Sequence, residues 1–266
     1  MADFRPVFKT LGVLICSLAM QTALPAGAQE RIASTSLCAD SYVLALAAHD
    51  NIHALSWQAA DKVAGTPDVR RGLPKAWDEP ERLLALSPDL VVFGPGEGKN
   101  AKPFLDRAAI SHVTLNWGED FQAVKANESL LASILGRANA HSPPPMAPAT
   151  GIRVLYLSRD GSTAGPDTFV DAAIRAAGGV NSVTRPGWRP YEPEYIAGLA
   201  PDLIITSFME SGYDSVNAAG KTQSLIADKL AAAPYINIPG RLWPCAGPGL
   251  YAARDRIANA IKDIVP

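Results

Sequence analysis

The chain has 266 residues, of which 48% are hydrophobic and 19% charged, and its formal net charge at pH 7 is −2. This length allows two lobes of ordinary size, each with its own core. The chain has no basic run or basic helical face, which argues against a nucleic-acid partner. Beyond residue 28, no stretch of about 18 uninterrupted apolar residues occurs that could span a membrane.

The first 28 residues are expected to be a signal peptide. Arg5 and Lys9 form a short positive region, and Leu11–Met20 is mostly apolar but too short to cross a bilayer. Ala26–Ala28 then offers the small residues that signal peptidase recognises, which predicts a secreted, soluble chain beginning at Gln29. The alternative is an uncleaved N-terminal anchor.

After this segment, short apolar runs alternate with helical stretches, a pattern typical of parallel βαβ units. Leu37–Asp40 is expected to be a turn, with Asp40 as the N-cap of the next helix because its carboxylate suits the positive end of the helix dipole. The first half is expected to contain the strands Arg31–Ser36, Asn51–Ser56, Leu90–Phe93 and His112–Asn116, and helices over 41–48 and 104–109.

The second half repeats this order of elements. Its expected strands are Arg153–Leu157, Leu203–Thr206 and Tyr235–Ile238, and its expected helices are Thr168–Ala177, Glu194–Leu199, Ser224–Ala231 and Gly249–Ile264. Between the halves, 120–140 has apolar residues at helical spacing, and the proline-rich 141–148 must be extended. We therefore predict an N-terminal lobe over 29–119, a connecting helix and linker over 120–150, and a C-terminal lobe over 151–266.

One segment occurs twice. Glu79–Val92 and Glu192–Ile205 align without a gap, and half of their paired positions are identical. The spacing of the two copies is too long for a solenoid unit and is about the size of one small domain. The repeat predicts two similar lobes with a ligand cleft between them.

Aromatic and polar side chains at the carboxyl ends of the expected strands are the candidate ligand contacts, because ligands of open parallel sheets bind beyond those ends. All five tryptophans lie outside the expected regular elements, and aromatic residues with a polar tip suit a large, partly apolar ligand. An arginine can pair with an anionic group on such a ligand. The candidates are Ser36, Leu37, Trp57, Trp117, Ser158, Arg159, Trp188, Arg189, Tyr191, Phe208 and Trp243.

The predicted mature chain has two cysteines, Cys38 and Cys245. In an oxidising compartment an even number favours a disulfide, which here would join the two ends of the chain. Two separate thiols are the alternative.

The sequence offers no catalytic residues, no resident metal site and no cofactor. The four histidines have no i, i+4 helical spacing, and no Gly-x-Ser-x-Gly nucleophile motif occurs. These features argue against an enzyme.

Three motifs carry a resemblance to a known family. Arg31–Asp40, the spaced Glu81 and Leu86–Val92, and Ala177–Asn181 resemble periplasmic binding proteins of iron–siderophore and vitamin B12 ABC importers. The resemblance covers nearly the whole predicted mature chain. It implies an α/β fold of two Rossmann-like lobes joined by a single interdomain helix, a monomer in the periplasm, and little hinge motion. The linker here is shorter than is usual in the family, which puts the stiff hinge in doubt.

The resemblance also implies partners. In this family one glutamate on each lobe docks on arginines of the membrane permease, and the matching positions are Glu81 and Glu194. The vitamin B12 binders place a tryptophan six residues before the second glutamate, where Trp188 stands; the matching residue of the first lobe is displaced to Trp77.

The resemblance thus predicts a small-molecule metal chelate or corrinoid and an ABC permease in the inner membrane as partners. A ferric siderophore is slightly favoured by Arg159 and Arg189, and cobalamin or haem is the alternative. A periplasmic enzyme or a sensor on a similar two-lobed scaffold remains a reading from a different class.

Overall fold

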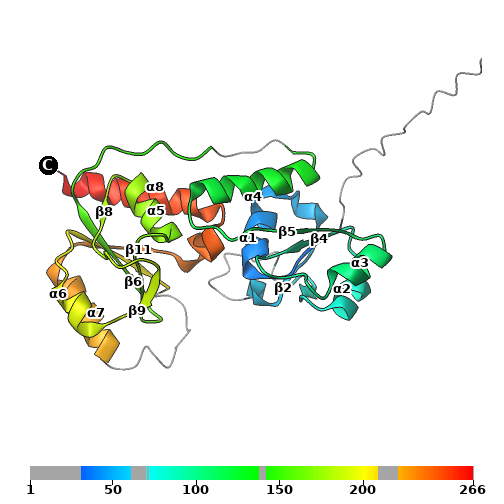
Figure 1. The fold of residues 1–266 in the computed structure, drawn as a ribbon, viewed down its shortest axis with the longest axis horizontal. Helices are drawn as coiled ribbons and strands as arrows, with labels where there is room; N and C mark the ends of the chain where they lie inside the picture. Colours follow the sequence, from blue (N-terminus) through cyan, green and yellow to red (C-terminus); the bar gives the residue numbers. More distant parts are fainter. Residues whose placement is uncertain (1–30, 61–69, 71, 138–141, 209–220, 266) are drawn as a thin grey trace, which may run out of the picture.

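The computed structural model describes residues 31–60, 70, 72–137, 142–208 and 221–265, so the expected signal peptide lies outside the described residues. The chain forms two lobes side by side, each with a parallel β-sheet and covering helices (Figure 1). This is the α/β architecture that the alternating sequence pattern predicts.

The N-terminal lobe has a five-stranded parallel sheet in the order β3-β2-β1-β4-β5. The innermost strands are short apolar runs buried on both faces, as expected for a parallel sheet with helices on both sides. The strands are β1 (Ile32–Ser34), β2 (Ile52–Ser56), β3 (Lys75–Ala76), β4 (Leu90–Phe93) and β5 (Ser111–Thr114), and the helices are α1 (Leu37–Leu46), α2 (Pro80–Leu86) and α3 (Lys102–Arg107), with single 3-10 turns η1 (His49–Asn51) and η2 (Trp57–Ala60).

The C-terminal lobe has a four-stranded parallel sheet in the order β11-β10-β6-β8, and an antiparallel pair of β7 and β9. Its strands are β6 (Arg153–Ser158), β7 (Ser162–Ala164), β8 (Val180–Asn181), β9 (Trp188–Pro190), β10 (Leu203–Ser207) and β11 (Tyr235–Ile238). Its helices are α5 (Phe169–Ala176), α6 (Pro193–Gly198), α7 (Lys221–Ala232) and α8 (Gly249–Ile264), with 3-10 turns η6 (Gly240–Leu242) and η7 (Pro244–Ala246).

The start of α1 differs from the expectation. The helix begins at Leu37, and its N-cap is Ser36, whose Oγ accepts a hydrogen bond from the Ala39 amide at 3.4 Å. Asp40 is instead inside the first turn with a buried side chain, so its prediction as the N-cap is wrong. Ser36 takes the role because its extended backbone leads directly out of β1.

The repeated segment has the same structure in both lobes. Glu79 and Glu192 each precede a helix that starts with proline, and the aspartate at the end of each copy anchors the first strand of its lobe. The Arg31 amide donates to Asp89 Oδ2 at 3.0 Å, and the Arg153 amide donates to Asp202 Oδ2 at 2.9 Å. The aspartate of the Pro-Asp-Leu part of the repeat therefore fixes the start of the first strand in each lobe.

The lobes are connected by α4 (Phe121–Ile134), which the Asp120 side chain caps, and by an extended segment that follows it (Figure 1). This segment lies on the C-terminal lobe, where the Ala147 and Thr150 amides donate to Ala176 O at 3.3 Å and Gly178 O at 2.9 Å. Prolines favour this extended backbone. In the part of the chain that the structure describes, no helix has the length and apolar character needed to cross a membrane.

Candidate functional site

The carboxyl edges of the two sheets meet where η7, from the C-terminal lobe, contacts α1 and α4. The Tyr42 hydroxyl donates to Ala246 O at 2.8 Å, and a disulfide joins Cys38 to Cys245 with a Cα–Cα distance of 5.3 Å. We call the loops at these carboxyl edges the interlobe face: residues 35–37, 57–58, 94–98 and 116–118 of the N-terminal lobe, and 159–161, 188–191, 208 and 239–247 of the C-terminal lobe.

Two of the tryptophans predicted to contact ligand are exposed on the N-terminal side of this face. Trp57 directly follows β2 and is 51% exposed, and Trp117 follows β5 and is 71% exposed. Ser36 and Leu37 lie between them in the sheet order, at the start of α1, and the Leu37 amide donates to Gln58 Oε1 at 3.2 Å. The N-terminal lobe therefore presents two large aromatic surfaces beside a helix start.

Asp40 lies just below Ser36 and Leu37 and holds the ends of β1 and β2 to α1. Its carboxylate accepts hydrogen bonds from Ser34 Oγ, from the Ser56 amide at 2.9 Å and from Ser56 Oγ at 2.5 Å. Burial raises the pKa of Asp40 to about 6; the serine hydrogen bonds oppose this shift, and the nearby Glu97 carboxylate adds to it. Sequence pattern gave no sign of this site, because a single aspartate near a helix start reads first as a cap.

We expect the protein to gain stability relative to an Asp40→Asn variant as the pH is lowered into the mildly acidic range. Because the folded-state pKa is raised, the stabilising contribution of the neutral acid is complete below pH 3.8 and is lost as the pH rises through about 6. The difference in unfolding free energy between the two proteins should change by about 2.5 kcal/mol between pH 4 and pH 8. Urea titrations across this range measure it.

The control for this experiment is Asp263→Asn, which changes an exposed carboxyl group on α8. Measured in the same way, it shows how much of the pH dependence comes from removing any one carboxyl group. A flat difference curve for Asp40→Asn would show that burial does not disfavour the ionised form of Asp40.

The loop after β4 is held against the same helix start. Glu97 Oε2 accepts hydrogen bonds from Thr35 Oγ1 at 2.6 Å and from the Gly94 amide at 2.7 Å, and Asp78 Oδ2 accepts one from the Gly98 amide at 2.9 Å. A Cβ atom on Gly94 would lie 2.1 Å from Ser36 Oγ, so only glycine allows this close approach. The loop thus forms a fixed wall of the interlobe face.

On the C-terminal lobe, Trp188 in β9 is 46% exposed and stands on two other aromatic rings. Its ring centroid lies 6.0 Å from that of Tyr156 and 5.1 Å from that of Phe169. Edge-on and tilted contacts of this kind fix the orientation of a ring. The structure thus presents Trp188 as a supported aromatic surface on the second lobe.

Trp243 is not at the surface, and its prediction as a direct ligand contact needs correction. It is 2% exposed, and its ring lies 5.8 Å from that of Tyr156 and 6.2 Å from that of Phe169. The turn η7 that follows Trp243 folds over α1, so the indole is enclosed in the core that both lobes share. Trp243 thus packs on the same two rings, Tyr156 and Phe169, on which Trp188 stands.

Most of the other predicted residues of this lobe lie at the end of β6 or in and directly after β9. Tyr191 donates from its hydroxyl to Ser158 O at 2.6 Å, while the Arg159 amide donates to Ser207 O at 3.1 Å. Arg189 pairs with Glu192 at 3.4 Å, which weakens its case as a contact for an anionic ligand.

Phe208 has a φ of +61° and packs on Gly240, where a Cβ atom would come within 2.3 Å of its ring. The Phe208 ring lies directly on the Gly240 backbone, which joins the end of β10 to the loop after β11. Phe208 is therefore packed at the edge of the interlobe face, where only its outer part could meet a ligand.

The repeat supplies a second candidate site, at the amino ends of α2 and α6. Each start carries two glutamates, and in each lobe one of them is paired with an arginine that also stacks on an aromatic ring. Arg82 pairs with Glu79 at 2.7 Å and lies 4.0 Å from the ring centroid of Trp77. Trp77 directly follows β3, whose Ala76 pairs with Ser56 of β2, so this displaced tryptophan lies at the same edge of the sheet as Trp57 and also contacts the second candidate site.

In the C-terminal lobe, Arg185 pairs with Glu192 and lies 4.3 Å from the ring centroid of Tyr195. The hydrogen bond from Arg185 lowers the pKa of Glu192. Glu81 and Glu194 are exposed and have no hydrogen-bond or ion-pair partner among the described residues. Each lobe therefore presents one free carboxylate beside one paired carboxylate.

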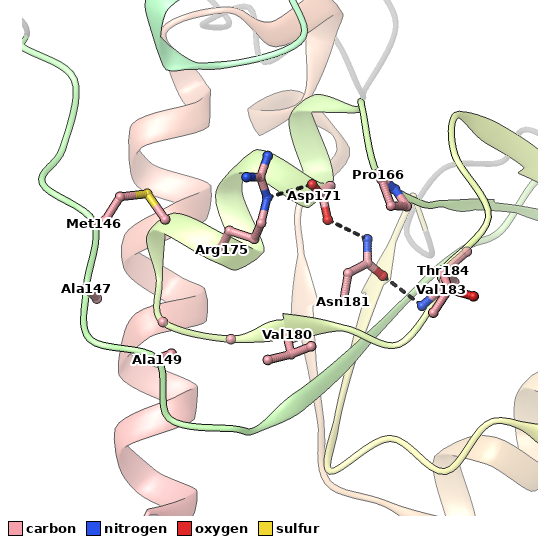
Figure 2. Close-up of a pocket in the computed structure, with 12 residues that line it drawn as sticks. Met146, Ala147, Ala149, Pro166, Asp171, Arg175, Val180, Asn181, Val183 and Thr184 are labelled. Atoms are coloured by element: carbon pink, nitrogen blue, oxygen red, sulfur yellow. Dashed lines mark hydrogen bonds and ion pairs between the residues drawn. The ribbon is translucent and has the colours of Figure 1, made fainter.

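A cavity of about 470 Å³ lies elsewhere, between the extended connector and the end of α5. Its polar side chains bond to one another: Arg175 pairs with Asp171 at 2.7 Å, and Asn181 Nδ2 donates to Asp171 Oδ1 at 3.0 Å (Figure 2). None of the predicted ligand contacts lines this cavity. The network is structural, since it joins β8 to α5.

The described histidines lie away from the interlobe face. His53 lies near the amino end of β2, where its ring contacts Arg31 at 2.8 Å. His112 lies near the amino end of β5, where its ring contacts Asp106 at 2.9 Å. Over the described ranges, no group of three or more His, Cys, Asp or Glu side chains is arranged to hold a metal ion.

Comparison with known proteins agrees with this architecture. No model of a known protein family matches the chain. A protein named "Cobalamin-binding protein" from Halobacterium salinarum is 38% identical over 71 residues, which is 25% of this chain and 19% of that protein. The match thus spans about a fifth of the curated relative's length.

Among solved structures, the periplasmic heme binding protein HutB of Vibrio cholerae superimposes with a TM-score of 0.64 at 22% identity, covering 88% of this chain and 99% of that one. The periplasmic vitamin B12 binding protein BtuF of Vibrio cholerae gives a TM-score of 0.60 at 17% identity, covering 88% and 97%. At these identities the likeness establishes a shared fold. The chain has the two-lobed fold of these periplasmic binding proteins.

Proposed function

We propose that this chain is the periplasmic solute receptor of an ABC importer, which captures a bulky metal chelate on the interlobe face and delivers it to a permease in the inner membrane. The observation that carries the proposal is the placement of three exposed tryptophans on that face: Trp57 and Trp117 on one lobe and Trp188 on the other. Large rings on opposing lobes suit a wide, partly apolar ligand.

A corrinoid suits the described residues best. The described histidines lie at the other edge of the sheets, so these side chains would suit a chelate whose metal is already fully coordinated. The aromatic surfaces favour a large ring over a small anion, and the curated relative is named for cobalamin binding. A ferric siderophore is the second candidate, since Arg159 follows β6 on the same face and a guanidinium can pair with an anionic chelate; Arg189 would first have to leave Glu192.

Tryptophan fluorescence tests the ligand class. Titration of the purified protein with cyanocobalamin, hemin and a panel of ferric siderophores should produce saturable quenching by one of the three. Quenching by cyanocobalamin supports the corrinoid, and a response to a siderophore alone supports the second candidate. If none of the three changes the fluorescence, the chain does not bind this class of ligand. That result would favour a periplasmic enzyme or sensor over a solute receptor.

We expect Trp188→Ala to raise the dissociation constant for the bound chelate by up to about 10-fold, because an aromatic contact is worth about 0.5–1.5 kcal/mol. Isothermal titration measures the constant directly. The control is Tyr235→Ala, which removes an exposed aromatic side chain at the amino end of β11 and should leave the affinity unchanged. Equal losses in both variants would mean that the effect is not local to the interlobe face.

For permease docking we propose Glu81 and Glu194. Both are exposed at helix starts that the repeat places in equivalent positions on the two lobes, and both lack a partner within the described part of the chain. Their neighbours Glu79 and Glu192 are already neutralised by Arg82 and Arg185. A free carboxylate is available to an arginine on another protein, whereas a paired one must first break its own contact.

A further inference from the structure

In its described part, the covalent connection between the lobes combines one helix with a non-helical segment. Helix α4 ends at Ile134, and the chain from 142 to 152 has no regular structure. Its Ala147 and Thr150 amides donate to backbone carbonyl groups of the C-terminal lobe. An extended strap of this kind cannot by itself fix the angle between two lobes.

A second connection crosses between the lobes at η7. The Cys38–Cys245 disulfide joins residues 207 positions apart in sequence, and the Tyr42 hydroxyl donates to Ala246 O at 2.8 Å in a buried position. A Cβ atom added to Gly247 would lie 2.4 Å from Ser41 Oγ, so the turn lies directly against α1.

We propose that this second connection is an interlobe brace that positions the ligand contacts of one lobe against those of the other. The brace consists of Cys38, Tyr42, Trp243, Cys245 and Ala246. In the proposal, the disulfide is a positioning element for ligand capture as well as a stabilising link.

The contacts run unbroken from one ligand surface to the other. Cys38 is in the first turn of α1, next to Leu37 on the interlobe face, and it is bonded to Cys245. Two residues before Cys245, Trp243 packs on Tyr156. Tyr156 in turn supports Trp188, the exposed ring of the second lobe.

Every link in this path is a covalent bond or a packed aromatic contact. A rigid path of this kind reduces the ordering that ligand binding would otherwise require. The proposal rests on the proposed function only for its ligand readout, because the geometry of the lobes can be measured without any ligand.

Single-molecule fluorescence transfer between the lobes tests the brace. Dyes attached through maleimide to Ala85→Cys on α2 and Asp228→Cys on α7 report the interlobe distance from exposed positions. In the Cys38→Ser/Cys245→Ser background the distance distribution should become about twofold broader than in the disulfide-bonded protein. A dye pair within the C-terminal lobe, at Asp228→Cys and Asp263→Cys, should show no change.

The ligand readout uses cyanocobalamin. We expect its affinity to fall about 10-fold in the double serine variant, since the ligand must then order the two lobes itself. If the distance distribution broadens but neither protein binds cyanocobalamin, the result supports the interlobe brace and rejects the proposal that the ligand is a corrinoid.

If the double serine variant does not fold, the labelled native protein is reduced with a phosphine and its thiols are blocked with N-ethylmaleimide, which asks the same question of a chain that has already folded. An interlobe distribution that stays as narrow as in the oxidised protein would overturn the brace.

Discussion

Reversing the charge of both docking glutamates, Glu81→Lys with Glu194→Lys, is expected to abolish uptake of the chelate while leaving its affinity for the receptor unchanged. Both side chains are exposed at helix starts and lie outside the interlobe face. Losing one partner of an interfacial charge pair costs about 2–5 kcal/mol, so losing two should weaken docking at least ~100-fold. Uptake of labelled chelate by cells and binding to the permease in nanodiscs measure the two effects.

The structure supplies a matched control for this experiment. Glu79→Gln with Glu192→Gln removes the two carboxylates that pair with Arg82 and Arg185. Each of these glutamates precedes a docking glutamate by two residues at the same helix start. This variant should transport normally, because those carboxylates already form ion pairs within the protein and are not expected to bind the permease. Normal transport by the charge-reversed protein, or equal loss in the control, would refute the assignment of Glu81 and Glu194.

Replacing both Cys38 and Cys245 by serine is expected to lower the free energy of unfolding by about 5 kcal/mol. The bond joins residues 207 positions apart, and the entropy that a cross-link removes from the unfolded chain grows with the size of the closed loop. Denaturant titrations of the oxidised protein and the double variant measure the difference. A loss below about 1 kcal/mol would show that the unfolded chain is barely restricted by the link.

Local pattern was sufficient for most of the regular structure. Strands β4 and β11 and helix α8 have the expected bounds, because apolar runs, helical periodicity and the flanking prolines and glycines act within a few residues of one another. The repeat likewise predicts α2 and α6 as equivalent parts of two lobes, and the structure gives them the same start and the same anchoring aspartate. Two lobes of parallel α/β structure thus follow from sequence.

Local sequence pattern did not predict which side chains are buried. Trp57, Trp117 and Trp243 occupy similar places after their strands, yet Trp57 and Trp117 are exposed and Trp243 is enclosed. Only the return of η7 to α1 makes the difference, and that contact joins residues more than two hundred positions apart. Asp40 changes from an expected cap to a buried acid for a similar reason, since its partners Ser34 and Ser56 come from two different strands.

What the sequence by itself determined is therefore the set of elements, their duplication into two lobes, and the equivalent positions of Glu81 and Glu194 in the two copies. The tertiary structure alone decided which aromatic rings reach the surface, which carboxylates are paired, and that Cys38 and Cys245 lie close enough to be joined. The physical reason is one of range: propensity and periodicity act between neighbours in the chain, whereas burial and pairing depend on segments that meet only after the lobes have packed.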